Sequence, residues 1–357
     1  MKILIDGREL IENRITGIGR FLRNFLEYAV NFRPDWSFVL LGNQYSCSFI
    51  ASHNLTERVV AEKGRLWWDQ IQSLVVSQKE RPDIYFSPYY KCPLLNNVKT
   101  IVTVHDLIEF ILPDYRRDFL YRWMVKLCLR KADRIVTVSQ SSREDVCRIL
   151  RLPWEKIVVS YNSVQRKPVG RDKKQAILAR YGIRKGYVLY VGNFNPHKNI
   201  AALIRAYSLL PAGLRQKWDL VIAGGRPEAL TEGKTLEGVV FPGHIDESDL
   251  PAVYEGAGLF VFPSLYEGFG LPPLEAMAYG IPVIASNRPA MVEILGEAAE
   301  FFEPHDNKAL TALMAKLLSS QEDRKRCIEE GLQRVRKFET GPNIERILNT
   351  METLVGS

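Results

Sequence analysis

The chain has 357 residues, of which 46% are hydrophobic and 25% are charged, and its formal net charge is +7. We expect two domains, because single hydrophobic cores rarely grow beyond about 250–300 residues. The composition is typical of a soluble globular protein, and no apolar run reaches the roughly 18 residues of a membrane span. The start becomes polar too soon for a signal peptide, and the five cysteines show no disulfide or zinc spacing, so a cytoplasmic location is expected.

The positive charge is concentrated in the first half. Residues 1–165 contain 24 Lys and Arg against 18 Asp and Glu, a net of +6, whereas the remainder contains 24 against 23, a net of +1. Between Tyr115 and Arg134, seven basic residues and two acidic ones alternate with aromatic and aliphatic side chains. Such a helix can lie on an anionic membrane surface, and the alternative is a half-buried helix with a solvated basic face. No recognition motif for nucleic acid accompanies the charge.

Strand and helix patterns alternate through the first half. The expected strands are 2–5, 36–41, 84–86, 100–104, 134–138 and 157–160. The expected helices between them are 19–30, 67–78, 118–131 and 141–150. This alternation predicts a parallel, doubly wound sheet.

A polar, basic stretch at 165–174 indicates a linker, after which the alternation restarts. The expected strands are then 187–191, 218–223, 239–242, 259–263 and 282–285. The expected helices are 200–209, 247–254, 272–278, 289–295, 308–319, 322–337 and 343–354. We therefore predict an α/β protein with a first domain at 1–165, a second at 166–340 and a closing helix at 341–357. In open α/β sheets ligands bind beyond the carboxyl ends of the strands, so a cleft between two such domains is the expected site.

Two carboxylates eight positions apart, Glu267 and Glu275, flank a glycine loop and a proline pair. The prolines predict the first turn of a helix, where a missing N–H has no partner to lose. A helix N-terminus with unpaired N–H groups attracts anions. The two carboxylates, one in the loop and one expected in the first helical turn, would then accept sugar hydroxyls beside a bound phosphate. The alternative is a capped helix with an acidic first turn.

Two loops of the first half contain candidate ligand-binding residues. Gly17 and Gly19 open a helix after the first strand, where backbone N–H groups can approach a phosphate or a sugar, although a turn-forming glycine pair is the alternative. Leu22 stands where a dinucleotide fingerprint needs glycine. His105 ends an apolar strand, so it can donate to a hydroxyl near a reacting centre or serve only as a buried structural histidine.

Two loops of the second half are further candidates. Asn193 and Lys198 lie between a strand and a helix start, which suits a pyrophosphate leaving group, while a solvated loop lysine is the alternative. His244 and Ile245 lie in a strand–loop–helix start whose backbone can face a base, with Asp246 as the expected N-cap. No DxD and no His–carboxylate cluster with metal spacing occurs, so no metal or other cofactor is expected.

Together these segments resemble the family 4, or group 1, glycosyltransferases of GT-B architecture. The resemblance rests on the motifs 16–20, 104–106, 132–139, 190–192 with Lys198, the loop from Gly243, and the E-x7-E pattern of Glu267 and Glu275. It implies two Rossmann-like domains facing across a cleft, with a last helix that crosses back onto the first domain. It also implies a metal-independent, retaining transferase that uses a nucleotide-activated sugar of GDP or UDP type and a glycan acceptor, which can be lipid-linked.

The resemblance also implies roles for single residues. Glu275 accepts from the ribose hydroxyls, Glu267 holds hydroxyls of the transferred sugar, and Lys198 binds the diphosphate. The amides of Phe269, Gly270 and Leu271 contact the phosphate and sugar. His105 contacts the sugar near the reacting carbon, and Gly17 and Gly19 approach the donor or acceptor from the facing domain.

The chain departs from the family pattern at three places. Asn193 stands where arginine is frequent, residues 162–165 read Asn-Ser-Val-Gln instead of Asn-Gly-Val-Asp, and residues 338–340 lack a tryptophan. The segments 6–8, 65–69 and 83–88 are similar to those of bacterial mannosyl- and rhamnosyltransferases of polysaccharide assembly, so GDP-mannose is the first expectation for the donor. An NAD-dependent oxidoreductase, a catalytically inactive scaffold, and an epimerase or phosphorylase of the same architecture are the alternatives.

Overall fold

The computed structural model describes residues 1–11, 16–46, 50–225 and 236–356. The chain forms two compact units. The first combines Met1–Ser163 with Glu339–Ser357, and the second is Val164–Phe338. The boundaries expected from the sequence, after residues 165 and 340, each differ by two residues from these.

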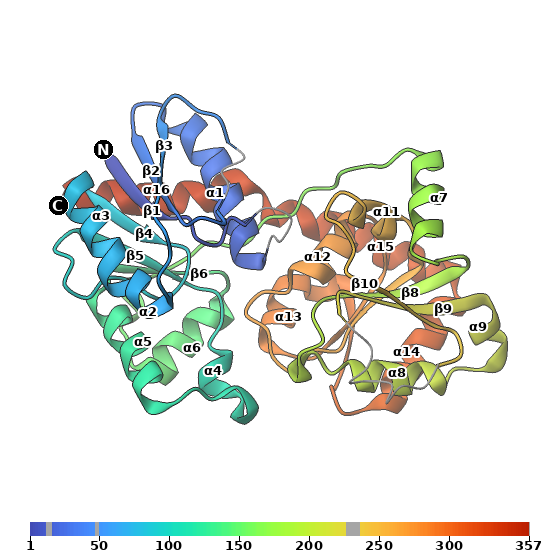
Figure 1. The fold of residues 1–357 in the computed structure, drawn as a ribbon. Coiled ribbons are helices and arrows are strands. Elements are labelled where there is room, and N and C mark those ends of the chain that lie inside the picture. Colours follow the sequence, from blue (N-terminus) through green and yellow to red (C-terminus); the bar gives the residue numbers. More distant parts are fainter. Residues whose placement is uncertain (12–15, 47–49, 226–235, 357) are drawn as a thin grey trace. The chain divides into compact units, whose positions relative to one another are not determined.

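The first unit is built on a parallel sheet of seven described strands in the order β3-β2-β1-β4-β5-β6-β7 (Figure 1). Ile3 of β1 lies opposite Phe38 of β2 on one side and Ile84 of β4 on the other. The central strands are apolar on both faces because helices cover both sides of the sheet. The strands are β1 (Lys2–Asp6), β2 (Ser37–Gly42), β3 (Leu55–Val59), β4 (Ile84–Ser87), β5 (Lys99–Val104), β6 (Arg134–Thr137) and β7 (Ile157–Val159).

Two hydrophobic clusters hold helices onto the faces of this sheet. Phe25 of α1 (Gly17–Phe32) and Leu348 of α16 (Thr340–Gly356) are buried in one cluster. The last helix thus belongs to the first unit, where the Ser160 hydroxyl also donates to the Asn343 carbonyl at 2.9 Å. The other cluster contains residues of the π-helical turn η1 (Trp68–Gln72) and of the helices α3 (Ser73–Glu80), α4 (Ile108–Ile111), α5 (Phe119–Lys131) and α6 (Gln140–Leu150). The short segments α2 (Arg65–Trp67), η2 (Pro113–Tyr115) and η3 (Trp154–Lys156) complete the described helices of this unit.

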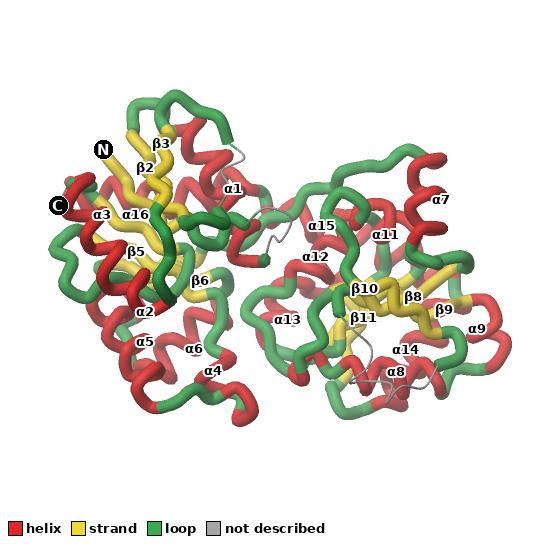
Figure 2. The backbone as a smooth tube through the Cα atoms, viewed as in Figure 1, coloured by secondary structure: helices red, strands yellow, loops and turns green. Residues whose placement is uncertain are grey.

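The second unit repeats this architecture with six described parallel strands in the order β10-β9-β8-β11-β12-β13, which Figure 2 shows in yellow among its helices. The strands are β8 (Gly186–Val191), β9 (Trp218–Ala223), β10 (Val239–Gly243), β11 (Leu259–Phe262), β12 (Val283–Ser286) and β13 (Ala299–Phe302). The helices are α7 (Arg171–Arg180), η4 (Pro196–Lys198), α8 (Ile200–Ser208), α9 (Ala212–Lys217), α11 (Leu250–Gly256), α12 (Leu271–Ala278), α13 (Pro289–Leu295), η5 (Gly296–Ala298), α14 (Asn307–Ser319), α15 (Gln321–Val335) and η6 (Arg336–Phe338).

Several elements differ from the sequence-based expectation, and the short helices α4 and α9 were not expected at all. Strands β3 and β13 were not expected, because β3 is an edge strand whose residues after Leu55 are exposed, and β13 is a short strand whose two central residues are only half-buried. Helix α7 occupies part of the expected linker, and only Ile177 of it is buried, so it carries no apolar periodicity. Helix α11 begins at Leu250, with Asp249 at the N-cap position, so the expected start at 247 and the expected cap at Asp246 are wrong. Pro251 in the first turn explains the later start.

Candidate functional site

The strand order of the second unit reverses between β8 and β11, which pair with each other. In open α/β sheets such a switch point leaves a crevice beyond the carboxyl ends of the two strands, and ligands bind there. The loop after β8 contains Asn193 and Lys198, and the loop after β11 contains Glu267. A hydrogen bond of 2.7 Å from the Leu265 amide to the His197 carbonyl joins the two loops. The fold therefore brings together residues that are 69 positions apart.

Lys198 and Glu267 form an ion pair at this edge. The Lys198 ammonium donates to Glu267 Oε1 at 2.6 Å, and the two side chains are only 13% and 14% exposed. The ammonium also lies 5.3 Å from the centre of the Phe262 ring. The Asn199 side chain donates to the Pro263 carbonyl at 3.3 Å and to the Pro304 carbonyl at 2.9 Å, which anchors the start of α8. The two charges that the sequence analysis assigned to leaving group and sugar thus neutralise each other in the free protein.

The loop from Glu267 leads directly into α12. Gly270 has a φ of 95°, and a Cβ at this position would lie 2.3 Å from Met291 Cε, so glycine is required there. Phe269 is buried and contacts the Phe338 ring edge-on, with centroids 5.8 Å apart. The helix begins at Leu271, and Pro272 occupies its first turn. The backbone N–H groups of residues 269–271 are thus held at a helix N-terminus that favours anions.

Glu275 lies in the second turn of α12, so the expectation that it occupies the first turn is wrong. Its Oε2 accepts a hydrogen bond of 2.8 Å from the hydroxyl of Tyr254 on α11. Tyr254 is 1% exposed and stacks on Tyr279, with ring centroids 5.3 Å apart and planes inclined by 4°. Tyr254 thus fixes one oxygen of this carboxylate. The sequence analysis missed it because an aromatic residue in a buried helix has no spacing that distinguishes it from ordinary core.

The other expected donor contacts of this unit are more exposed or lie further along the sheet. Asn193 is exposed, and its carbonyl accepts a hydrogen bond of 3.0 Å from the buried Tyr190 hydroxyl. His244 is exposed and Ile245 is buried, and both follow the edge strand β10, two strands away from β8. The structure therefore groups Asn193, Lys198 and Glu267 at the switch point and leaves His244 and Ile245 at the margin of the same sheet edge.

In the first unit, Gly17 and Gly19 form the first turn of α1. The Thr16 hydroxyl caps this helix by accepting from the Gly19 amide at 3.1 Å, and both glycines have ordinary helical backbone. Gly17 is exposed and Gly19 is buried. An exposed first turn without acidic residues suits an approaching anion or hydroxyl.

His105 lies at the carboxyl end of β5. Its Nε2 is 2.8 Å from the Pro88 carbonyl, and since a carbonyl only accepts, Nε2 carries the proton. Burial lowers the pKa of His105 to about 4, so the ring is neutral at pH 7. The Phe21 ring packs edge-on at 5.2 Å. Nδ1 is therefore the nitrogen that can accept from a hydroxyl, whereas donation to a hydroxyl was one of the roles that the sequence left open for His105.

Among the described residues, no group of three or more His, Cys, Asp or Glu side chains is arranged to hold a metal ion.

Two family models match the chain. The model described as Glycosyl transferases group 1 covers residues 173–334, and the model described as Glycosyltransferase Family 4 covers residues 17–167. The chain is 34% identical to O-antigen chain mannosyltransferase B of Escherichia coli over 268 residues, which are 71% of the chain and 70% of that protein. It is 30% identical to O-antigen chain mannosyltransferase RfbU of Salmonella typhimurium, covering 62% of the chain and 61% of the relative. It is also 34% identical to the serotype-specific mannosyltransferase WbdA of E. coli, but there it spans only 29% of the relative's length.

Solved structures share the fold at low sequence identity. A sucrose-phosphate synthase from Thermosynechococcus elongatus superposes with a TM-score of 0.77 at 19% identity, covering 100% of this chain and 99% of the other. WaaG, a glycosyltransferase involved in lipopolysaccharide biosynthesis, gives 0.76 at 16% identity with full coverage of both chains. Anabaena HepE in complex with UDP-glucose gives 0.77 at 17% identity, covering 99% and 100%. The chain therefore belongs to the group 1 and family 4 glycosyltransferases, and it has their GT-B fold of two Rossmann-like domains.

Proposed function

We propose that this glycosyltransferase transfers mannose, with retention of configuration, from GDP-mannose to a glycan of a bacterial surface polysaccharide. The observation that carries the proposal is the Lys198–Glu267 pair at the β8/β11 switch point, next to the N-terminus of α12. The choice of mannose rests on the names of the relatives, which are O-antigen mannosyltransferases. Retention and the GDP base follow from the resemblance described above.

The roles follow from where each group lies. Glu275, held by Tyr254, accepts from the ribose diol, and Glu267 accepts from hydroxyls of the sugar. Lys198 and the amides of residues 269–271 face the diphosphate. As the bond from the anomeric carbon to the diphosphate breaks, the acceptor oxygen bonds to that carbon and the acceptor proton leaves with the diphosphate. In the first unit, His105 accepts from a sugar hydroxyl through Nδ1, and the exposed first turn at Gly17 and Gly19 approaches donor or acceptor.

To bind, the donor must replace both partners of the Lys198–Glu267 ion pair at once. The diphosphate takes over Lys198 from Glu267, and a sugar hydroxyl takes over Glu267 from Lys198. Each charged group exchanges one charged or polar partner for another, so neither is left buried and unpaired, which would cost several kcal/mol. Metal independence is part of the proposal, with Lys198, the backbone amides and the helix dipole stabilising the leaving charge.

The acceptor is proposed to be lipid-linked, with a peripheral membrane contact through α5 at the cytoplasmic face. Phe119, Leu120 and Trp123 are 83%, 66% and 49% exposed, whereas Val125 and Leu129, further along the helix, are buried. The C-terminal half of α5 is thus core, and the N-terminal turns present apolar side chains beside Arg116 and Arg122. Aromatic side chains next to basic ones suit the interface of an anionic bilayer. Among the described residues, no helix is long and apolar enough to cross a membrane.

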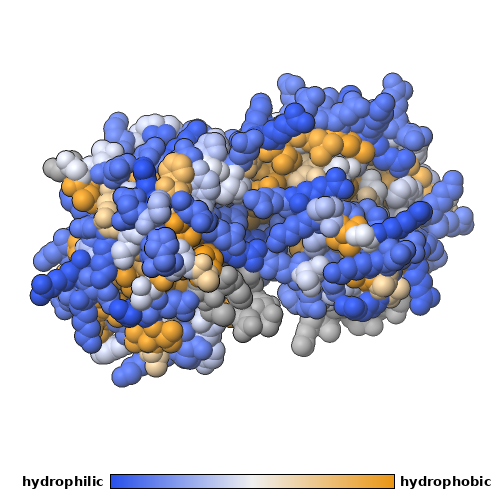
Figure 3. Space-filling view, turned by 90° about the horizontal axis from the view of Figure 1, so that it is seen from above, coloured by the Kyte–Doolittle hydropathy of each residue, from blue (hydrophilic) through white to orange (hydrophobic). Residues whose placement is uncertain are grey.

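The face seen in Figure 3 is mostly hydrophilic, and its hydrophobic residues gather in several patches. Soluble proteins carry such scattered patches routinely. A membrane contact must therefore be tested at α5 itself and not inferred from overall surface hydropathy.

A donor panel tests the proposed function. The full chain is titrated with the GDP-, UDP-, ADP- and dTDP-linked sugars by thermal shift and calorimetry, and products are identified by mass spectrometry and anomeric NMR. GDP-mannose should bind and yield an α-linked product. A preference for another nucleotide sugar, or an inverted anomer, contradicts the donor or the stereochemistry. Absence of binding to every nucleotide sugar favours the inactive scaffold.

A further inference from the structure

The first unit has its own switch point, which the proposed function leaves without a ligand. Its strand order reverses between β1 and β4, at the place that corresponds to β8 and β11 in the second unit. Asp6 is the last residue of β1 and Arg8 follows it, and Tyr89 and Lys91 follow β4. The same topological argument that locates ligands beyond β8 and β11 therefore applies to this edge.

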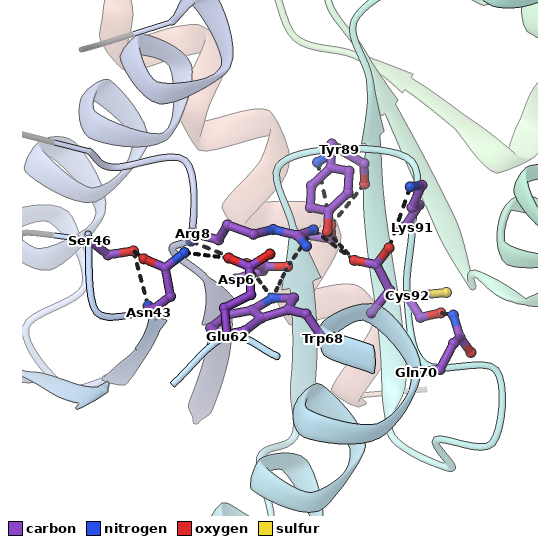
Figure 4. A network of polar contacts seen from close by, with 12 residues as sticks. Asp6, Arg8, Asn43, Ser46, Glu62, Trp68, Gln70, Tyr89, Lys91 and Cys92 are labelled. Carbon is purple, nitrogen blue, oxygen red and sulfur yellow. Dashed lines mark hydrogen bonds and ion pairs between the residues drawn. The ribbon is translucent and has the colours of Figure 1, made fainter. Parts of the chain in front are cut away.

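A buried polar network occupies this position (Figure 4). The Arg8 guanidinium donates to Asp69 Oδ1 at 2.7 Å and lies 3.6 Å from Asp6 Oδ2. The Tyr89 hydroxyl donates to the same Asp69 oxygen, and the Lys91 ammonium is 3.4 Å from Asp69 Oδ2. The side chains of Asp6, Asp69 and Arg8 are 1%, 2% and 10% exposed.

Two aromatic rings border the guanidinium. Arg8 Cζ lies 4.5 Å from the centre of the Tyr89 ring and 5.6 Å from that of the Trp68 ring, and the Trp68 indole donates to Asp6 at 3.2 Å. Trp68 and Asp69 belong to the π-helical turn η1. Such turns are rare inside helices and are frequent at functional sites. The motifs 6–8 and 65–69, which the sequence analysis left without a role, thus meet at one place.

One hydrogen-bond donor of this network has no acceptor in the part of the chain that the structure describes. Among the described residues, the Nε–H of Arg8 is buried and has no hydrogen-bond partner. Burial raises the pKa of both Asp6 and Asp69 against the lowering effect of Arg8. A buried guanidinium N–H without an acceptor is costly, and a ligand oxygen would satisfy it. Tyr89 and Lys91 are half-buried, so they connect the network to solvent.

The charges select the chemistry of the ligand. Asp6 and Asp69 contact two cations, Arg8 and Lys91, and the charge of Glu62, which accepts from the Asn43 amide at 2.6 Å, also acts on Arg8. Three carboxylates against two cations disfavour a phosphate or another anion. The carboxylates can accept hydrogen bonds from ligand hydroxyls, and the guanidinium and ammonium groups can donate to hydroxyl oxygens. The two aromatic rings offer apolar faces to C–H groups of a ligand. A neutral polyol can use all three kinds of contact, whereas a hydrocarbon chain can contact only the ring faces.

We propose that the network formed by Asp6, Arg8, Asp69, Tyr89 and Lys91 is a saccharide-binding site that holds a neutral sugar unit of the acceptor glycan. The inference rests on the proposed function, because it requires that a glycan is the acceptor. Asp69, Arg8 and the hydroxyl of Tyr89 bind sugar hydroxyls, the rings of Tyr89 and Trp68 border the sugar ring, and Lys91 lies on the solvent side.

The test measures acceptor and donor affinity separately. The variants are Asp69→Asn, Arg8→Lys and Tyr89→Phe, and the control is Glu80→Gln. Glu80 is a poorly exposed carboxylate in the same unit, paired with Lys2 at 2.6 Å and Arg58 at 2.6 Å, and it contacts the opposite end of β1. The acceptor probes are the α-p-nitrophenyl glycosides of mannose, rhamnose, glucose, galactose and N-acetylglucosamine. Donor affinity is measured by calorimetry with the nucleotide sugar that binds the wild type.

We expect the variants to raise the KM for the accepted glycoside by about 10-fold or more, as when a hydrogen bond to a charged group is lost. The donor Kd should stay within about twofold, and the control should match the wild type in both measurements. Thermal melting identifies a misfolded variant, and Tyr89→Phe, which removes only a hydroxyl, then decides the question. Unchanged acceptor KM in folded variants, or an equal rise in the control, overturns the saccharide site. If the wild type binds no nucleotide sugar at all, the proposed function fails instead.

Discussion

Replacing Lys198 by alanine should reduce turnover far more than donor affinity. In the free protein the ammonium is already engaged with Glu267 at 2.6 Å, and both side chains are largely buried. Donor binding therefore exchanges one anionic partner for another, so the net gain from Lys198 in the ground state is small. The diphosphate gains charge only as the glycosidic bond breaks, so the contribution of Lys198 is largest in the transition state.

The magnitudes follow from this exchange. Loss of one preorganised group facing a developing charge costs on the order of 10²-fold in kcat, or about 3 kcal/mol. The donor Kd should rise by less than about 10-fold, because a single hydrogen bond to a charged group is worth about 1.5–3 kcal/mol before the pairing with Glu267 is subtracted. Single-turnover product formation gives the chemical step, and calorimetry gives the Kd.

A matched control separates catalysis from general loss of an ion pair. Lys316 pairs with Glu300 at 3.1 Å in the same unit, and its side chain is 45% exposed. Lys316→Ala should leave kcat and Kd at wild-type values, since exposed pairs contribute little. The reasoning is refuted if Lys198→Ala raises KM while kcat is unchanged, because Lys198 would then bind donor and transition state equally.

Four further predictions test other parts of the account. Glu275→Ala should weaken donor binding by about 10- to 100-fold, because the ribose diol loses its acceptor, and calorimetry on a folded variant that shows unchanged affinity contradicts the assignment. His105 has a pKa lowered from 6.5 to about 4 by burial, so the fold favours its neutral form, and its contribution is complete above about pH 6.5 and is lost as the pH falls toward 4. Between pH 6.5 and pH 4 the free energy of unfolding of the wild type should therefore fall by about 3 kcal/mol more than that of His105→Gln. The free energies are measured by denaturant titration at each pH, and an equal fall in both proteins would show that His105 is not desolvated. Activity should survive EDTA, and full loss that Mg²⁺ or Mn²⁺ restores would overturn the metal-free proposal. The chain should co-sediment with anionic liposomes at low salt and less at high salt, and charge reversal at Arg116, Arg117 and Arg122 should abolish this, so unchanged binding of that variant removes α5 as the contact.

The order of strands, loops and helices around the site was predictable from local sequence patterns. Apolar strands that end at glycine, proline or histidine predicted where β5, β8 and β11 stop, because turn residues interrupt a buried run. The proline pair after Gly270 predicted the start of α12 to within one residue, since proline tolerates only the first turn. Elements without an apolar pattern were not predictable, which explains why β3 and α7 were missed.

Which distant residues meet depends on the tertiary structure and was not predictable from local patterns. Lys198 pairs with Glu267 only because β8 and β11 are neighbours at the reversal of strand order, and local patterns do not specify strand order. The contact of Tyr254 with Glu275, the tautomer of His105 and the meeting of Arg8 with Asp69 depend likewise on packing between segments that the sequence lists separately. Hydrogen-bond direction and desolvation are properties of a side chain's surroundings, so they became definite only when the two sheets and their helices were in place.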